Sequence, residues 1–211
     1  AQSVDDFLPG HPVSYLLTNE GRGARIAAVD LRQPNPSPLG QITLQSEYTV
    51  IRLLDSAPNL IASAWNEGIV ILDATQPQAI RQIYAPPEEN TVLYNYSGTA
   101  VVNNVVYMPL EGQSSFTGDF VGKLGAYDLQ DPSNPQLGGS VDTVLTSFEM
   151  LVHSGDYLYL LGDIEEKKLV IIDINDPLTP KIVSTFALPE NASRLAVVDK
   201  MVYASCEGHD C

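Results

Sequence analysis

The densest group of reactive side chains lies at the C-terminal end of the sequence, where residues 206–211 read CEGHDC. Its two thiols, imidazole and two carboxylates are all potential metal ligands. The spacing of the cysteines is not a usual zinc spacing, and no second pair of ligands accompanies it. We therefore interpret Cys206 and Cys211 first as a disulfide candidate, with free thiols or a metal site as the alternatives.

Acidic residues form a second group, in two loops at matching positions of the sequence. Residues 111–123 form an insertion, and residues 163–168 occupy the corresponding place further along the chain. If the two loops are adjacent, they bring together oxygen ligands suited to Ca²⁺: Glu111, Asp119, Asp163, Glu165 and Glu166. No EF-hand spacing accompanies them, so solvated charge at two hairpin tips is the alternative interpretation.

No arrangement of residues indicates a known type of catalysis. His153 stands beside Ser154 and Asp156 in a predicted turn, but the members of a catalytic triad meet through the fold rather than by sequence adjacency. The chain contains neither a phosphate-binding P-loop nor a Gly-x-Ser-x-Gly elbow. A few aromatic residues suit either a sugar- or peptide-binding surface or ordinary core packing: Trp65, Tyr94, Tyr96 and Phe116.

Four aspartates recur at regular intervals, each at the end of an apolar segment. Asp30, Asp73, Asp128 and Asp173 are 43, 55 and 45 residues apart, and a proline follows each one within a few residues. A carboxylate at the end of a strand can accept backbone N–H groups of the following turn. Because there are four equivalent copies, we interpret these aspartates as structural residues of a repeat rather than as catalytic groups.

Each aspartate lies at the end of the third strand in a repeating unit of four short strands joined by turns. Asn, Asp, Gly and Ser residues separate neighbouring apolar runs, as at residues 103–104, 153–156 and 199–200, and such residues tolerate the positive φ of hairpin turns. No stretch keeps a helical period. The spacing of the repeat is in the range of propeller blades. We predict one all-β domain over residues 1–211, a β-propeller of antiparallel blades with units at 13–45, 48–86, 99–142 and 148–187, and a further blade begun or closed by 194–206.

The best copies of the repeat resemble a known family. Residues 169–173 read LVIID and are followed by Asp176, Pro177 and Pro180, which resembles the LVIVD repeat. The resemblance extends from about residue 13 to residue 204. It implies a β-propeller and a bacterial or archaeal protein that is secreted or carried on the cell surface. It implies no reaction.

The ends of the chain do not match a whole number of predicted blades. The chain opens on what resembles a second strand and stops after the first two strands of another unit. Four blades, or a segment of a larger propeller, both fit this pattern. Strands 194–198 could close a four-bladed ring by pairing with the N-terminal strands, whereas an open ring would expose strand edges that invite pairing with another chain. The predicted partner is therefore another protein or a second copy.

Composition limits the partners further. Eleven basic residues face 26 acidic ones, a net charge of −15, which disfavours binding to nucleic acid. No apolar run approaches the roughly 20 residues of a membrane helix. The start at Ala1 and the two sequons at Asn95 and Asn191, which are candidate glycosylation sites, suit an exported chain.

Together these features predict a non-enzymatic extracellular or cell-surface propeller that serves as a binding or assembly module. The alternative is a propeller hydrolase or lyase with a metal-assisted site in its central funnel, since the fold by itself does not exclude one. Apart from the possible Ca²⁺, no cofactor is predicted.

Overall fold

The computed structural model describes residues 6–9, 13–19, 23–45, 50–64, 68–85, 98–110, 122–163, 165–199 and 201–206. These residues form eighteen β-strands and one short 3-10 helix, η1 (Pro77–Ala79). The chain divides into two compact units, one of residues 1–92 with 132–134 and the other of residues 93–131 with 135–211. None of the described segments is a helix long and apolar enough to cross a membrane.

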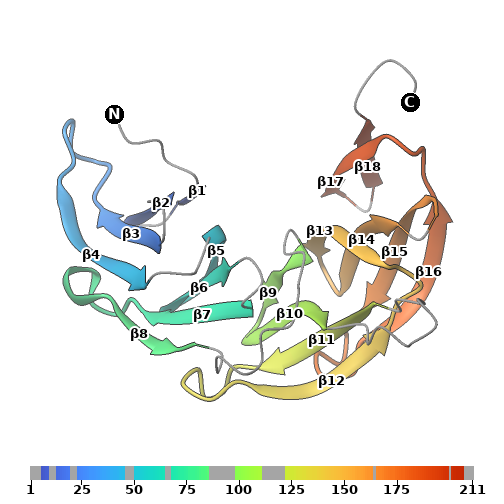
Figure 1. The fold of residues 1–211 in the computed structure, drawn as a ribbon, viewed down its shortest axis with the longest axis horizontal. Helices are drawn as coiled ribbons and strands as arrows, with labels where there is room; N and C mark the ends of the chain where they lie inside the picture. The colour runs from blue at the N-terminus through green and yellow to red at the C-terminus, as the bar shows by residue number, and fades with distance from the viewer. Residues whose placement is uncertain are drawn as a thin grey trace. The chain divides into compact units, whose positions relative to one another are not determined.

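The first unit contains two four-stranded antiparallel sheets, whose strands lie side by side in chain order (Figure 1). The first sheet consists of β1 (Asp6–Leu8), β2 (Ser14–Asn19), β3 (Gly23–Val29) and β4 (Pro38–Gln45). The second sheet consists of β5 (Val50–Ser56), β6 (Asn59–Ala64), β7 (Gly68–Asp73) and β8 (Arg81–Tyr84).

Strand β1 differs from the sequence interpretation, in which the chain opens on a second strand at residue 13. Residues 6–8 pair with residues 15–17 of β2, so the first sheet has four strands. Three residues are too few to show a period in the sequence, and only the pairing with β2 reveals the strand.

The second unit contains two four-stranded antiparallel sheets and a two-stranded one. The third sheet consists of β9 (Ala100–Val102), β10 (Val105–Leu110), β11 (Lys123–Asp128) and β12 (Gln136–Asp142). The fourth sheet consists of β13 (Ser147–Ser154), β14 (Tyr157–Asp163), β15 (Lys167–Asp173) and β16 (Lys181–Ala187). The fifth sheet consists of β17 (Ala192–Val198) and β18 (Met201–Cys206).

The predicted hairpin turns between first and second strands are confirmed in this unit. Asn103 and Asn104 join β9 to β10 with φ angles of 48° and 43°. Gly155 and Asp199 occupy the matching turns of the next two sheets with φ angles of 60° and 48°. Asparagine, aspartate and glycine adopt this left-handed conformation at low cost, which explains their presence at these positions.

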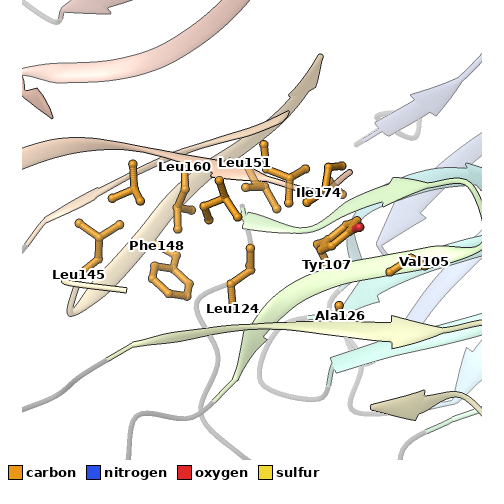
Figure 2. Packing of buried hydrophobic residues seen from close by; sticks show 13 residues of the cluster. Val105, Tyr107, Leu124, Ala126, Leu145, Phe148, Leu151, Leu160 and Ile174 are labelled. Carbon is orange, nitrogen blue, oxygen red and sulfur yellow. The ribbon is translucent and has the colours of Figure 1, made fainter. Parts of the chain in front are cut away.

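Sheets within a unit pack face to face through apolar side chains. In the first unit Leu17 and Ile26 of the first sheet share a buried cluster with Leu60 and Leu72 of the second. In the second unit Figure 2 shows Tyr107 and Leu124 of the third sheet facing side chains of the fourth sheet, such as Leu151 and Leu160. Strand β15 packs against the third sheet through Val170 and Ile172 and against the fifth sheet through Leu169, which explains its unbroken apolar sequence.

Candidate interaction surface

The fifth sheet has two strands, whereas each of the other four sheets has four. Strand β18 pairs with β17 along one side, and no described strand pairs with its other side. Half of the N–H and C=O groups of such a strand point away from its neighbour, so they are available to pair with another strand. We call this side of β18 the open edge.

One face of the fifth sheet is buried against the fourth. Leu195 of β17 belongs to a cluster with Tyr159, Leu161 and Leu169, and the side chains of β18 that point the same way pack against that cluster. The backbone N–H of Leu195 also lies 3.2 Å from Sδ of Met150 in β13. These contacts hold the two-stranded sheet in place, so the open edge belongs to an ordered element.

The opposite face of the fifth sheet is exposed, and its part next to the β17–β18 turn is apolar. Val198, Met201 and Tyr203 are 55%, 59% and 57% exposed, and the register places Val198 opposite Met201 and Ala196 opposite Tyr203. We call these four residues the outer face. Tyr159, which occupies the position of Tyr203 in the fourth sheet, is only 7% exposed because the fifth sheet covers it. The outer face is therefore equivalent to the face of the fourth sheet that the fifth sheet covers.

The four repeat aspartates form turns. Each Oδ1 accepts a hydrogen bond from the backbone N–H two residues later, and the donors are Arg32 for Asp30 (3.1 Å), Thr75 for Asp73 (3.0 Å), Gln130 for Asp128 (2.9 Å) and Asn175 for Asp173 (2.8 Å). This is the Asx-type turn expected from the sequence.

Two of these aspartates have a lowered pKa. The side-chain hydrogen bond from Arg32, together with its backbone N–H, lowers the pKa of Asp30 to about 2. The hydroxyl and backbone N–H of Thr75 and the guanidinium of Arg81 lower the pKa of Asp73 to about 2. Hydrogen bonds to the ionised form account for both shifts.

The lowered pKa of Asp73 predicts an acid-dependent contribution to stability. A folded-state pKa below the unfolded value of about 3.9 adds stability above pH 4 that is lost as the pH falls towards 2. Asp73→Asn is therefore expected to lower the melting temperature at neutral pH, and the difference from the parent should shrink between about pH 4 and pH 2. Melting curves followed by circular dichroism across this range measure the effect.

Asp142→Asn is the matched control for that measurement, because Asp142 is 68% exposed and pairs with the surface residue Lys123 at 3.0 Å. Exposed ion pairs of this kind contribute little to the stability of the folded protein. A difference between Asp73→Asn and the parent that stays constant down to pH 2 would contradict the assignment.

The structure describes only part of the predicted calcium site. Glu111 and Asp119 lie outside the described residues, and the other three candidates lie at or near the β14–β15 hairpin. Asp163 pairs with Lys167 at 3.5 Å, and Glu166 pairs with Lys168 at 3.3 Å. Within the described ranges no cluster of three metal-binding side chains occurs. The calcium site stays a prediction.

Lys167 is the centre of a charged group in the fourth sheet. Its ammonium contacts the carboxylates of Glu149 on β13 and Asp163 on β14, and its side chain is only 16% exposed. The hydroxyl of Thr146 donates to the backbone carbonyl of Asp163 at 2.9 Å, which fixes the same corner. These contacts join three strands of one sheet, so the group stabilises the sheet.

The remaining predicted sites divide between described and undescribed parts of the chain. Cys206 is the last residue of β18, and Asn191 directly precedes β17. Cys211, the predicted disulfide partner of Cys206, and Asn95, the other candidate glycosylation site, lie outside the described residues. The disulfide and the glycosylation sites therefore stay predictions.

His153 is exposed, and its Nε2 lies 2.7 Å from the carbonyl of Gly155 within a hairpin turn. The predicted aromatic surface also falls outside the described residues: Trp65, Tyr94, Tyr96 and Phe116.

Sequence reasoning predicted the open edge but missed the outer face. The apolar residues of β17 and β18 occupy both faces of the strands, as they do in every repeat. The pattern alone does not distinguish a face that is covered from one that is not.

The comparison with protein families identifies one repeat. The model of the LVIVD repeat matches residues 150–187, which extend from β13 to the end of β16. The match confirms the resemblance inferred from the sequence. No curated protein matches the chain.

Solved structures show the fold. The hypothetical selenium-binding protein from Sulfolobus tokodaii is 16% identical and superposes with a TM-score of 0.65 over 89% of this chain and 55% of that one. The nidogen/laminin complex is 12% identical and superposes with a TM-score of 0.55 over 92% of this chain and 68% of that one. The predicted all-β propeller fold of four-stranded antiparallel blades is confirmed. The chain spans about half the length of the first of these proteins.

Proposed function

We propose that this chain is a non-enzymatic protein-binding module of the extracellular space or cell surface, and that it binds other polypeptides through the open edge of β18. The observation that carries the proposal is the group of exposed apolar side chains on β17 and β18, which lies beside an edge of β18 that pairs with none of the strands the structure describes. The edge supplies hydrogen bonds to an added strand, and the outer face supplies apolar area.

The composition of β18 supports this role. Soluble proteins usually protect an edge strand with lysine, proline, a bulge or a covering loop. Strand β18 reads MVYASC and contains no charged residue and no proline. Its two large exposed side chains, Met201 and Tyr203, are of types that are common in protein interfaces.

Other features agree with the proposed role and location. The net charge of −15 and the sequons at Asn95 and Asn191 suit an exported protein. The described aspartates of the repeat form turn hydrogen bonds, which is a structural role. The similar fold in the nidogen/laminin complex occurs in a protein assembly.

Self-association tests whether the open edge pairs with another chain, because a second copy is the simplest β-structured partner and presents the same edge. Sedimentation velocity over a range of concentrations is expected to show reversible association of the parent. Hydrogen exchange should show that the amides of β18 become protected as the concentration rises. The double variant Met201→Lys and Tyr203→Lys should remain monomeric, since lysines on an edge strand oppose pairing.

Tyr157→Lys is the matched control. Tyr157 is 37% exposed and occupies the position of Met201 in the fourth sheet, outside the fifth sheet. This variant should associate like the parent. A parent protein that stays monomeric at every concentration, with fast exchange along β18, would contradict the proposal.

A further inference from the structure

A sulfur atom lies at the contact between the fourth and fifth sheets. The backbone N–H of Leu195 on β17 donates a hydrogen bond to Sδ of Met150 on β13, and the nitrogen and sulfur are 3.2 Å apart. Met150 also packs against the apolar cluster through which the two sheets touch. A thioether is a weak hydrogen-bond acceptor, and it is also a group that can be oxidised. The contact between these two sheets therefore depends in part on the chemical state of one side chain.

A β-bulge in β13 places Met150 at this contact. The register of β13 against β14 shifts between Phe148 and Met150. In an unbroken strand these two side chains would point to the same face, because residues two apart lie on one side of a sheet. The bulge separates them, so that Phe148 joins the core shared with the third sheet and Met150 joins the cluster shared with the fifth.

The three methionines of the chain differ in their exposure to solvent. Met108 in the third sheet is only 5% exposed, and Met201 on the outer face is 59% exposed. Met150 is intermediate, since it is partly buried against the fifth sheet and partly accessible. Oxidation of methionine depends on access of the oxidant to sulfur. Met150 is therefore the methionine that combines access for a small oxidant with a hydrogen bond between two sheets.

We propose that Met150 is a reversible oxidation site, and that a hydroperoxide acting on it loosens the fifth sheet from the fourth. A lone pair of Sδ attacks the terminal oxygen of the hydroperoxide. The S–O bond forms as the O–O bond breaks, and the proton of the hydroperoxide passes to the departing oxygen, which leaves as an alcohol or water. The sulfur loses two electrons and the hydroperoxide gains them, which gives methionine sulfoxide.

The sulfoxide weakens the contact on whichever side the oxygen is added. The separation of 3.2 Å leaves no room for an oxygen atom between the sulfur and the nitrogen of Leu195, so an oxygen on that side pushes β17 away from β13. An oxygen on the other side makes a polar group of a side chain that packs against Leu161 and Leu169. Methionine sulfoxide reductases reduce both epimers, so the change can be reversed.

The test uses the full chain carrying Met201→Leu, which removes the most exposed methionine and leaves Met150 as the accessible one. The protein is treated with tert-butyl hydroperoxide at low protein concentration, so that self-association does not protect β17. Peptide mass mapping is expected to find one added oxygen on Met150 and none on Met108. Hydrogen exchange along β17 should then become about tenfold faster or more, because its amides open more readily once the contact is lost.

Three controls accompany this measurement. Exchange along β14, which pairs with β13 and β15 inside the fourth sheet, should not change. Methionine sulfoxide reductases acting on both epimers should restore the slow exchange of β17. The double variant Met150→Leu and Met201→Leu keeps an apolar side chain at position 150, and the hydroperoxide should leave its exchange unchanged.

The inference goes beyond the proposed function and does not depend on it, because it is measured by mass and by hydrogen exchange in the monomer. Resistance of Met150 to the hydroperoxide equal to that of Met108 would overturn it. Oxidation of Met150 that leaves exchange along β17 unchanged, or slows it, would also overturn it, since the sulfoxide would then hold the sheet as well as the thioether does. Faster exchange in the treated double variant would assign the effect to another residue.

Discussion

Replacing Tyr107 with alanine is expected to lower the free energy of unfolding of the second unit by about 3–5 kcal/mol. Tyr107 is fully buried, and its ring lies in the core shared by the third and fourth sheets (Figure 2). Alanine would leave a cavity between the two sheets that the strands on either side cannot close. It would also remove the hydrogen bond to the carbonyl of Pro177. Urea unfolding followed by circular dichroism measures the change.

Tyr107→Phe separates the hydroxyl from the ring. Phenylalanine keeps the packing and loses only the hydrogen bond, so the expected cost is about 1 kcal/mol. Equal losses from the alanine and phenylalanine variants would show that the ring contributes nothing, which would contradict the packing argument.

The hydroxyl of Tyr107 also predicts behaviour at alkaline pH. Burial, together with the charge of Asp176, raises the pKa of Tyr107 to about 12. A folded-state pKa above the unfolded value of about 10 contributes stability that is present below pH 10 and is lost as the pH rises towards 12. The parent should therefore lose stability over this range more steeply than Tyr107→Phe does, and melting curves at pH 9 to 12 distinguish the two.

Gly139→Ala is expected to destabilise the second unit by about 1–3 kcal/mol, although alanine is normally the better residue in a strand. The added Cβ would lie 2.1 Å from the backbone oxygen of Leu178. A backbone carbonyl in a turn that is fixed by its own hydrogen bonds cannot rotate away as a side chain can. The turn of the fourth sheet would have to move off β12, and thermal unfolding of the variant measures the cost.

The neighbouring glycine provides the control for this change. At Gly138 an added Cβ would meet the side-chain atom Cδ2 of Leu178 at 2.7 Å, and that side chain can change its rotamer. Gly138→Ala is therefore expected to cost clearly less than Gly139→Ala. If the two variants are equally stable, the close approach of the Leu178 carbonyl does not control the contact between the sheets.

Local features of the fold could be predicted from the sequence. Asn103, Asn104 and Asp199 indicated hairpin turns because few other residues adopt positive φ cheaply, and they have it in the structure. The spacing of Asp30 and its equivalents indicated the repeat because a carboxylate at that position forms an Asx turn wherever the strand ends. These properties depend only on neighbouring residues.

The sequence by itself determined the repeat and the propeller fold. The tertiary structure decided which surfaces remain open. Tyr159 and Tyr203 occupy equivalent positions in their strands, yet one is 7% exposed and the other 57%. A residue's exposure depends on which sheet packs over it, and that sheet comes from a distant part of the chain. For the same reason β1 was missed, since three residues become a strand only by pairing with β2.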